Sequence, residues 1–460
     1  MAKIQAIKGL TYAAASAGDV SAWIAPPYDV LDEPSKAALL RKSEHNIAAV
    51  DLPHLPAKTV GPDEAYASAG RNFSQWRQTG VLARSERAAL YVYRQTFGPL
   101  PGQATKLQRL GLIANVQLRP FGEGVYPHER TFPDACEDRL KLMRATGVQL
   151  SPIFGFYLDA EQQMQTRLAQ VAAGPPSFCG RTDGDGVLHE VWAVEDNQRS
   201  DAMITAWADR DVFIADGHHR YTTALNYQAE QVSAGTGQPG ADHCMFVLVA
   251  VQDPGMVVLP THRVIGGMHD FSMRRLREAS SQWLQIETFD AGSLAELEAA
   301  LPSRRPHGIG LFHPDDPEGP MSIATTIDSD PLSSICPDRK PVWRQLDVAI
   351  VESLILDTIC RPNFARSHAL TSAAAPAAPA SPSTTNNDDG ILWKFPHTLD
   401  QVQQMVTAGG FQLGIILQPV SIDAVSRVSE AGELMPQKST FFYPKLATGL
   451  IINPLFDPDV

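Results

Sequence analysis

The chain has 460 residues, 44% of them hydrophobic, and its 51 acidic residues outnumber its 38 lysines and arginines, giving a formal net charge of −13. This length exceeds what one hydrophobic core usually supports, and the charge disfavours binding to nucleic-acid phosphates or anionic lipids. The five cysteines form no C-x-x-C pair, no apolar run is long enough to span a membrane, and residues 1–10 lack the apolar core of a signal peptide, so we expect a multi-domain cytoplasmic protein.

The first predicted elements alternate between helices and strands, as in a mixed α/β fold. Region 1–107 contains predicted helices at 33–43 and 63–79 and a strand at 89–94. In region 108–270 we predict strands at 110–118, 151–158, 212–215 and 245–251, and helices at 136–146 and 222–234. The second region carries the sharpest motifs and is predicted to be the central domain.

The remaining elements are predicted in three stretches. Region 271–370 is a mixed region with an apolar helix at 347–358, and region 371–390 is an Ala/Pro/Ser/Thr/Asn tract too poor in large apolar groups to fold, which we interpret as a disordered linker. Region 391–460 begins with a βαβα pattern, consisting of strands at 391–395 and 411–417 and helices at 399–408 and 422–431. Its crossover is expected to be right-handed.

The strongest candidate site is the corner Asp216-Gly217-His218-His219-Arg220, between an apolar strand and a helix. Such corners are where α/β proteins bind ligands. Gly217 and the N–H groups of the new helix can approach an anion, and Arg220 can hold two phosphate oxygens. Asp216 can ligate Mg²⁺ or orient a hydroxyl, and His218 or His219 can donate to a phosphoryl oxygen. The alternative is that Asp216 caps the helix and the histidines are surface residues of a turn.

A second polar cluster, His128-Glu129-Arg130, follows the predicted strand at 110–118 through a glycine-bearing loop. A carboxylate next to a histidine can act as a general base, so Glu129 and His128 are candidate catalytic residues. A solvated salt-bridge cluster explains the same residues equally well. The pattern is not H-E-x-x-H, which argues against a zinc protease.

Three further segments are weaker candidates. The turn Pro26-Pro27-Tyr28-Asp29 presents a phenol and a carboxylate, although proline-rich turns are usually structural. Thr261-His262-Arg263 follows a short strand, and we expect it to border the same cleft as the corner. Lys438-Ser439-Thr440 and Tyr443-Pro444-Lys445 supply amines and hydroxyls that suit anion binding or a basic surface loop. No GxxxxGK[ST], GxGxxG or GxSxG motif occurs, so P-loop, dinucleotide-binding Rossmann and α/β-hydrolase chemistry are disfavoured.

The order of these motifs resembles the family called domain of unknown function 1015. The motifs that carry the resemblance are Ala25–Val30, His128–Thr131, Ser151–Phe154, Ile214–Tyr221, Thr261–Arg263 and Met435–Lys445. The corner by itself is similar to one in free serine kinases of the ParB/sulfiredoxin-like fold, which transfer phosphate between an adenine nucleotide and L-serine. This second resemblance implies a ParB/sulfiredoxin-like central domain, in which the corner lies at the nucleotide phosphates.

These resemblances favour a phosphotransferase that acts on serine, phosphoserine or a similar small hydroxy metabolite. Catalytic roles are expected for Asp216, His218, His219, Glu129 and His128, with Mg²⁺ at Asp216 and with ATP or ADP as the nucleotide. Nucleotide binding is expected at Gly217, Arg220, His262, Arg263, Lys438, Ser439 and Thr440. Two alternatives remain, namely a phosphatase that uses the same phosphate cradle and a non-catalytic nucleotide-binding ParB-like module. The partners expected are a small-molecule substrate and a nucleotide, with neither nucleic acid nor membrane.

Overall fold

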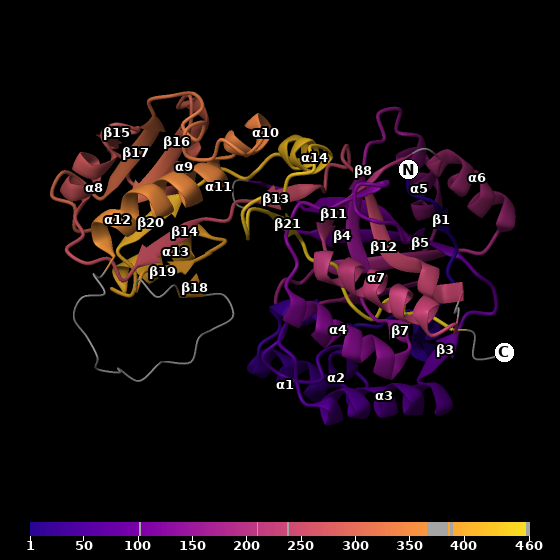
Figure 1. Ribbon diagram of the computed structural model, residues 1–460. Coiled ribbons are helices and arrows are strands. Elements are labelled where there is room, and N and C mark those ends of the chain that lie inside the picture. The colour runs from indigo at the N-terminus through magenta and orange to yellow at the C-terminus, as the bar shows by residue number, and fades with distance from the viewer. Residues whose placement is uncertain (101–102, 209, 237–238, 366–384, 387–389, 457–460) are drawn as a thin grey trace. The chain divides into compact units, whose positions relative to one another are not determined.

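The computed structural model describes residues 1–100, 103–208, 210–236, 239–365, 385–386 and 390–456 (Figure 1). The chain forms two compact units, which we call unit 1 (Met1–Val257 with Phe442–Val460) and unit 2 (Val258–Phe441). Each unit combines a sheet with helices, which confirms the predicted mixed α/β fold. Among the described residues, no helix combines the length and the apolar character that a membrane crossing requires.

Unit 1 is built on a nine-stranded sheet with the order β6-β11-β8-β12-β5-β4-β10-β9, in which β1 also pairs with β5. Its strands are β1 (Ile4–Gln5), β4 (Leu90–Phe97), β5 (Leu107–Gln117), β6 (Val125–Tyr126), β8 (Ile153–Tyr157), β9 (Phe178–Arg181), β10 (Leu188–Val194), β11 (Val212–Asp216) and β12 (His243–Ala250). Most neighbouring strands are antiparallel, but β8 runs parallel to β12 and β6 to β11. Every residue of β8 is buried, as expected for a central strand covered on both faces.

The helices of unit 1 cover this sheet and form a second, N-terminal core. Helix α4 (Pro133–Thr146) packs against α7 (His218–Ser233) through Leu140, Met143 and Tyr227 (Figure 1). The other helices are α1 (Glu33–Lys42), α2 (Ala48–Asp51), α3 (Asp63–Gln78), α5 (Gln163–Ala172) and α6 (Asn197–Trp207). Helices α1 to α3 and the small β2 (Leu10–Tyr12) and β3 (Leu82–Arg84) sheet enclose the N-terminal core. Helix α1 begins after Asp32, whose carboxylate accepts from the Ser35 N–H at 2.9 Å.

The C-terminal segment returns to unit 1 and is held there by strand pairing and by two buried side chains. Strand β22 (Asn453–Pro454) pairs with β7 (Val148–Gln149), and Thr448 bridges to Ala25. On the central strands, Arg109 donates to the Tyr443 carbonyl at 3.0 Å, and Gln95 donates to the Lys445 carbonyl at 2.9 Å. These bonds fix the main chain around Lys445.

Unit 2 contains a seven-stranded sheet with the order β15-β17-β16-β20-β14-β19-β18. Its strands are β14 (Arg263–Gly266), β15 (Leu284–Thr288), β16 (Gly308–Phe312), β17 (Met321–Thr326), β18 (Thr385–Asn386), β19 (Leu392–Lys394) and β20 (Leu413–Ile416). Its helices are α8 (Met273–Ser280), α9 (Leu294–Ala300), α10 (Pro341–Arg344), α11 (Asp347–Ala349), a π-helix (Ile350–Cys360), α12 (Arg361–Phe364), α13 (Leu399–Thr407) and α14 (Ile422–Glu430). Strands β13 (Val257–Leu259) and β21 (Phe441–Tyr443) lie where the chain passes between the units.

The predicted elements from the C-terminal βαβα pattern all form. Strands β19 and β20 both pair antiparallel with β14, so they run parallel to each other with β14 between them. Helix α13 connects them and packs its Val402 against the core of unit 2. Most of the predicted linker at 371–390 lies outside the described residues.

The structure divides the chain differently from the predicted regions. The boundary predicted at residue 107 falls at the first residue of β5, which pairs with β4 along its length, from Tyr91 and Ile113 to Phe97 and Leu107. The boundary predicted at residue 270 lies inside unit 2. Pattern alone could not find this division, because the strands that pair across a predicted boundary carry no local signal of their partners.

Candidate functional site

The Asp216 corner forms where β11 ends and α7 begins. The two carboxylate oxygens of Asp216 are each held by a cation, since Oδ2 lies 3.2 Å from Nη2 of Arg220 and Oδ1 lies 3.4 Å from Nζ of Lys445. Burial raises the pKa of Asp216, but Lys445 and Arg220 outweigh it and hold the pKa below its ordinary value. The side chain is 24% exposed. The corner therefore presents an ionised, accessible carboxylate between two cations.

Gly217 is required at this corner by its backbone and by its neighbour. It has a φ of +103°, in a region that favours glycine, and a Cβ added there would lie 3.0 Å from the Arg220 guanidinium. Gly217 itself is the N-cap of α7, and no side chain caps this helix end. The alternative in which Asp216 caps the helix is therefore wrong. Helix α7 starts at His218, four residues earlier than predicted, so both histidines and Arg220 lie in its first turn.

His128, Glu129 and His218 meet next to the corner. The His218 Nε2 accepts from the main-chain N–H of His128 at 3.1 Å, and His218 Nδ1 lies 3.8 Å from Glu129 Oε2. The His128 Nδ1 lies 2.8 Å from the carbonyl oxygen of Ile214 on β11. The imidazole rings of His128 and His218 pack edge to face, with their centroids 4.5 Å apart. The structure therefore brings the predicted base and two predicted catalytic histidines together with the end of β11.

These contacts determine which ring nitrogens carry protons. A carbonyl only accepts, so Nδ1 of His128 is protonated, and a main-chain N–H only donates, so Nε2 of His218 is not. Burial lowers the pKa of both histidines, and for His218 the neighbouring His128, His219, Arg220 and Lys445 lower it further. Both rings are therefore neutral at physiological pH. Neutral His218 then carries its proton on Nδ1, the nitrogen that faces Glu129.

His219 contacts Phe132, at the end of the loop before α4. Its Nε2 accepts from the Phe132 N–H at 3.1 Å, and its ring stacks on the Phe132 ring at a centroid distance of 5.9 Å. Arg220 is also partly engaged by protein, because its Nη1 donates to the Pro152 carbonyl. A role for His219 in charge stabilisation stays a prediction, whereas its contact with the 128–132 loop is a feature of the fold.

Two further charged groups lie at the corner, and sequence reasoning did not place them there. Asp29, from the Pro26–Asp29 turn, pairs with Lys58 at 2.7 Å. Burial raises the pKa of Asp29, but Lys58, Lys445 and Arg220 lower it more. The turn of Asp29 also pairs with the segment of Lys445 through Ala25 and Thr448. The proline turn was a visible signal for Asp29. Lys58 lies in a loop without a motif, and no sequence pattern marks it.

His262 and Arg263 belong to unit 2 and are both almost fully buried. His262 Nδ1 accepts from the Leu417 N–H at 3.2 Å, and burial lowers the pKa of this histidine to about 4. The Arg263 guanidinium lies over the Phe395 ring at 4.7 Å, and burial lowers its pKa to about 9. Because these residues belong to the other unit, the expectation that they border the same cleft stays a prediction.

The segment Lys438–Thr440 also lies in unit 2, where Arg263 holds its main chain. Arg263 Nη2 donates to the Lys438 carbonyl at 3.0 Å, and the Ser439 hydroxyl donates to the carbonyl of Pro436. Lys438 adopts a φ of +54°. Arg263 thus contacts backbone rather than offering an open guanidinium, and nucleotide binding by this segment stays a prediction.

A magnesium ion can be tested against the donors at the corner. Among the described residues, no group of three or more His, Cys, Asp or Glu side chains is arranged to hold a metal. Mg²⁺ in phosphotransfer sites is commonly held by one or two carboxylates together with substrate phosphates. Asp216 suits that partial role, since it is ionised and accessible, although a metal there would have to replace Lys445 at Oδ1.

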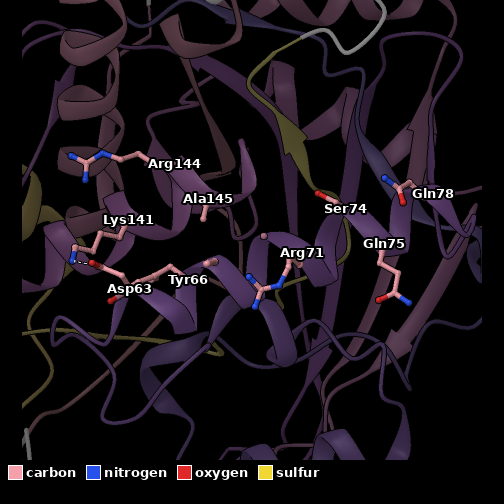
Figure 2. Close-up of a pocket in the computed structure, with 11 residues that line it drawn as sticks. Asp63, Tyr66, Arg71, Ser74, Gln75, Gln78, Lys141, Arg144 and Ala145 are labelled. Carbon is pink, nitrogen blue, oxygen red and sulfur yellow. Dashed lines mark hydrogen bonds and ion pairs between the residues drawn. The ribbon is translucent and has the colours of Figure 1, made fainter.

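Unit 1 also contains a groove away from the corner. It has a volume of about 940 Å³ and lies between α3 and α4, where Tyr66, Arg71, Lys141 and Arg144 line it (Figure 2). Its charges are already paired, for example Lys141 with Asp63 at 2.6 Å. None of the predicted site residues lines this groove. The size of the groove alone does not indicate a functional site.

A search of the curated proteins finds no match. Free serine kinase in complex with AMP is 12% identical, with 74% of this chain and 92% of that chain covered and a TM-score of 0.32. A conserved hypothetical protein from Pyrococcus furiosus is 12% identical, with 73% and 93% covered and a TM-score of 0.31. SbnI with C-terminal truncation from Staphylococcus aureus is 12% identical, with 75% and 87% covered and a TM-score of 0.31.

The family comparison is more specific than these structural similarities. Residues 4–349 match the model described as "Protein of unknown function (DUF1015)". This match spans most of the chain, including the Pro26–Asp29 turn, the Glu129 loop and the Asp216 corner. The chain therefore belongs to the DUF1015 family of proteins of unknown function.

Proposed function

We propose that the protein is a phosphotransferase that moves phosphate between an adenine nucleotide and a small hydroxylated acceptor of the serine type. The observation that carries the proposal is the convergence in unit 1 of an ionised Asp216, two cations and the Glu129 carboxylate beside neutral His218. The choice of nucleotide and acceptor follows the resemblance of the Asp216–Arg220 motif to that of free serine kinases.

The cations supply the phosphate-binding part of the reaction. Arg220 and Lys445 lie on either side of Asp216, and the N-terminal N–H groups of α7 are not capped by any side chain. Helix N-termini and arginines favour phosphate oxygens. Phosphoryl transfer depends mainly on positioning and on charge neutralisation, which these groups provide. Bound Mg²⁺ would add further charge neutralisation, with Asp216 as its protein ligand.

The Glu129 carboxylate supplies the proton acceptor. As the acceptor oxygen bonds to phosphorus and the bond from phosphorus to the nucleotide oxygen breaks, Glu129 takes the hydroxyl proton. His218 cannot serve as that base through Nε2, because this nitrogen accepts from the His128 N–H. Its Nδ1–H faces Glu129 instead, so His218 acts as a positioning residue for the carboxylate.

The proposal can be tested with purified protein, ATP or ADP, L-serine and Mg²⁺, with O-phosphoserine as the product measured. A thermal-shift series with each ligand supplies the binding readout, because a ligand at a hundred times its Kd stabilises the folded state by about 2.7 kcal/mol. We expect nucleotide-dependent formation of phosphoserine. Release of inorganic phosphate from phosphoserine without nucleotide would identify a phosphatase instead, and binding without turnover would identify a nucleotide-binding module.

A further inference from the structure

Lys58 lies on the segment between α2 and α3, and none of the proposed catalytic roles involves it. Its Nζ lies 2.7 Å from Oδ2 of Asp29, and its side chain is 29% exposed. Burial lowers the pKa of Lys58, but Asp29, Tyr28 and Asp216 raise it more, so the net shift is upward. The amine is therefore charged at neutral pH, and its electrostatic environment includes the carboxylate of the corner.

Hydrogen bonds hold the loop that carries Lys58 on both sides of this residue. On one side of Lys58, the His54 Nε2 lies 2.8 Å from the Asp138 carboxylate, and on the other side the Gly61 N–H donates to the Tyr66 hydroxyl at 2.9 Å. Lys58 itself has a φ of +66°, which is unfavourable for a residue with a side chain. The fold thus holds Lys58 in a strained conformation, with its amine on Asp29.

Cations from several segments act on Asp29. Lys58, Lys445 and Arg220 all lower the pKa of Asp29, and the same three cations lower that of Asp216. They come from three separate segments, namely the loop before α3, the C-terminal segment and the first turn of α7. The turn that carries Asp29 also pairs with the segment of Lys445 through the bridge between Ala25 and Thr448, and the pair of Lys58 and Asp29 is partly exposed there.

We propose that Lys58 is a further anion-binding residue of this site and contacts an oxyanion of the bound substrate, from either the nucleotide or the acceptor. This inference rests on the proposed function and extends it to the N-terminal segment. Asp29 acts as the positioning residue that holds the amine until the oxyanion binds. An ammonium that already lies beside a carboxylate can exchange that partner for a phosphate or carboxylate oxygen without a large change of conformation.

The competing explanation is that Lys58 and Asp29 form an ion pair that only stabilises the fold. The same unit contains a matched pair for comparison, because Lys141 lies 2.6 Å from Asp63 and its side chain is 27% exposed. Inorganic pyrophosphate serves as the probe, since it contains the oxyanions but neither adenine nor serine. Its affinity is measured by thermal shift and by calorimetry for wild type, Lys58→Met, Lys58→Arg, Asp29→Asn and Lys141→Met.

We expect Lys58→Met to weaken pyrophosphate binding by roughly tenfold to a hundredfold, as for loss of one charge-assisted contact. Lys58→Arg should retain most of the affinity, and Lys141→Met should equal wild type. Asp29→Asn should bind as tightly as wild type or more tightly, because it removes a competing negative charge. If Lys58→Met and Asp29→Asn both lower the melting temperature and neither changes the affinity, the pair is structural and the inference is overturned. Absence of pyrophosphate binding to wild type would overturn it too.

The same variants identify which substrate carries the oxyanion. A loss of affinity for ADP alone assigns Lys58 to the nucleotide phosphates, and a loss for O-phosphoserine alone assigns it to the acceptor. The outcome is independent of turnover, so the two proposals can fail separately. A protein that binds pyrophosphate through Lys58 but makes no phosphoserine would refute the proposed function and leave the anion site standing. A kinase whose Lys58→Met form binds pyrophosphate normally would refute only the role of Lys58.

Discussion

At residue scale, the proposed chemistry depends on a carboxylate that lies next to a neutral histidine. His218 is buried, and its pKa is well below the ordinary value. Its protonated Nδ1 lies 3.8 Å from Glu129 Oε2. Because the ring stays neutral, it lies beside Glu129 without forming an ion pair with it. In the proposed reaction this carboxylate is the proton acceptor.

Replacing Glu129 with Gln keeps the size of the side chain and removes the base. We expect kcat to fall by roughly 10²- to 10⁴-fold, the usual contribution of a general base, while the affinity for ADP stays unchanged. Steady-state kinetics and calorimetry measure the two quantities. Glu123→Gln, at an exposed position of the preceding loop, is the control and should behave as wild type. A Glu129→Gln enzyme with normal kcat would exclude Glu129 as the base.

Replacement of Asp216 and replacement of Arg220 should impair the activity in different ways. Asp216→Asn keeps the shape of the side chain but removes the charge between Lys445 and Arg220, so turnover should be lost while nucleotide still binds. Arg220→Ala removes a phosphate-binding cation, so KM for the nucleotide should rise. The measurement is kcat and KM for both variants. Full activity of Asp216→Asn would remove this residue from the chemistry.

At the scale of elements, the site depends on how the C-terminal segment is attached to the sheet. Gln95 on β4 donates to the Lys445 carbonyl, and its own oxygen accepts from Arg109 Nε at 3.1 Å. Both side chains are buried, so these bonds are made where water cannot replace them. The position of Lys445 therefore depends on the interior of the sheet.

Gln95→Met should lower the free energy of unfolding by about 1–3 kcal/mol, because it leaves buried polar groups on Arg109 and Lys445 without a partner. It should also weaken nucleotide binding, since Lys445 loses one of its attachments. Urea unfolding and calorimetry with ADP report the two effects. Gln108→Met, at an exposed position of neighbouring β5, is the matched control. Equal stability of the two variants would contradict this role of Gln95.

Elements whose residues are adjacent in the sequence could be predicted, whereas contacts between distant segments could not. Strand β11, Gly217 and α7 could be predicted, because an apolar run, a glycine and a helical pattern are adjacent in the sequence. The proximity of His128 and Glu129 to the corner was expected, because the His128–Glu129 motif and the corner each follow a predicted strand. The contacts of Asp216 with Lys445, and of Asp29 with Lys58, could not be found. They depend on pairings between distant segments, and a single lysine in a loop leaves no periodic signal.

At the scale of the whole molecule, buried neutral histidines make stability depend on pH. Burial, with Arg109 and Arg181, lowers the pKa of His189 to about 3, and burial lowers that of His262 to about 4. In the unfolded chain a histidine titrates near pH 6.5. Between these values the unfolded state binds more protons than the folded state, so the free energy of unfolding falls as the pH falls.

We therefore expect stability to be maintained above pH 6.5 and to be lost progressively toward pH 4, by up to about 1.4 kcal/mol per pH unit for each such histidine. His189→Gln removes one titrating group and can keep hydrogen bonds to Tyr93 and Thr182, which lie 2.7 and 3.0 Å from the ring nitrogens. Urea unfolding of both proteins from pH 7.5 to 4.5 should show a shallower decline for the variant. Identical slopes would show that His189 ionises in the folded state.

The two parts of unit 1 are separated along the chain by the whole of unit 2. A ribosome adds residues from the N-terminus onward, so Asp216, Arg220 and Glu129 are synthesised long before Lys445. Unit 2 is one continuous segment and is complete before residues 442–456 leave the ribosome. A nascent chain that stops before this segment lacks both Lys445 and the β22 partner of β7. The corner is thus completed only after the whole of unit 2 has been synthesised, so the order of synthesis delays the assembly of the proposed site.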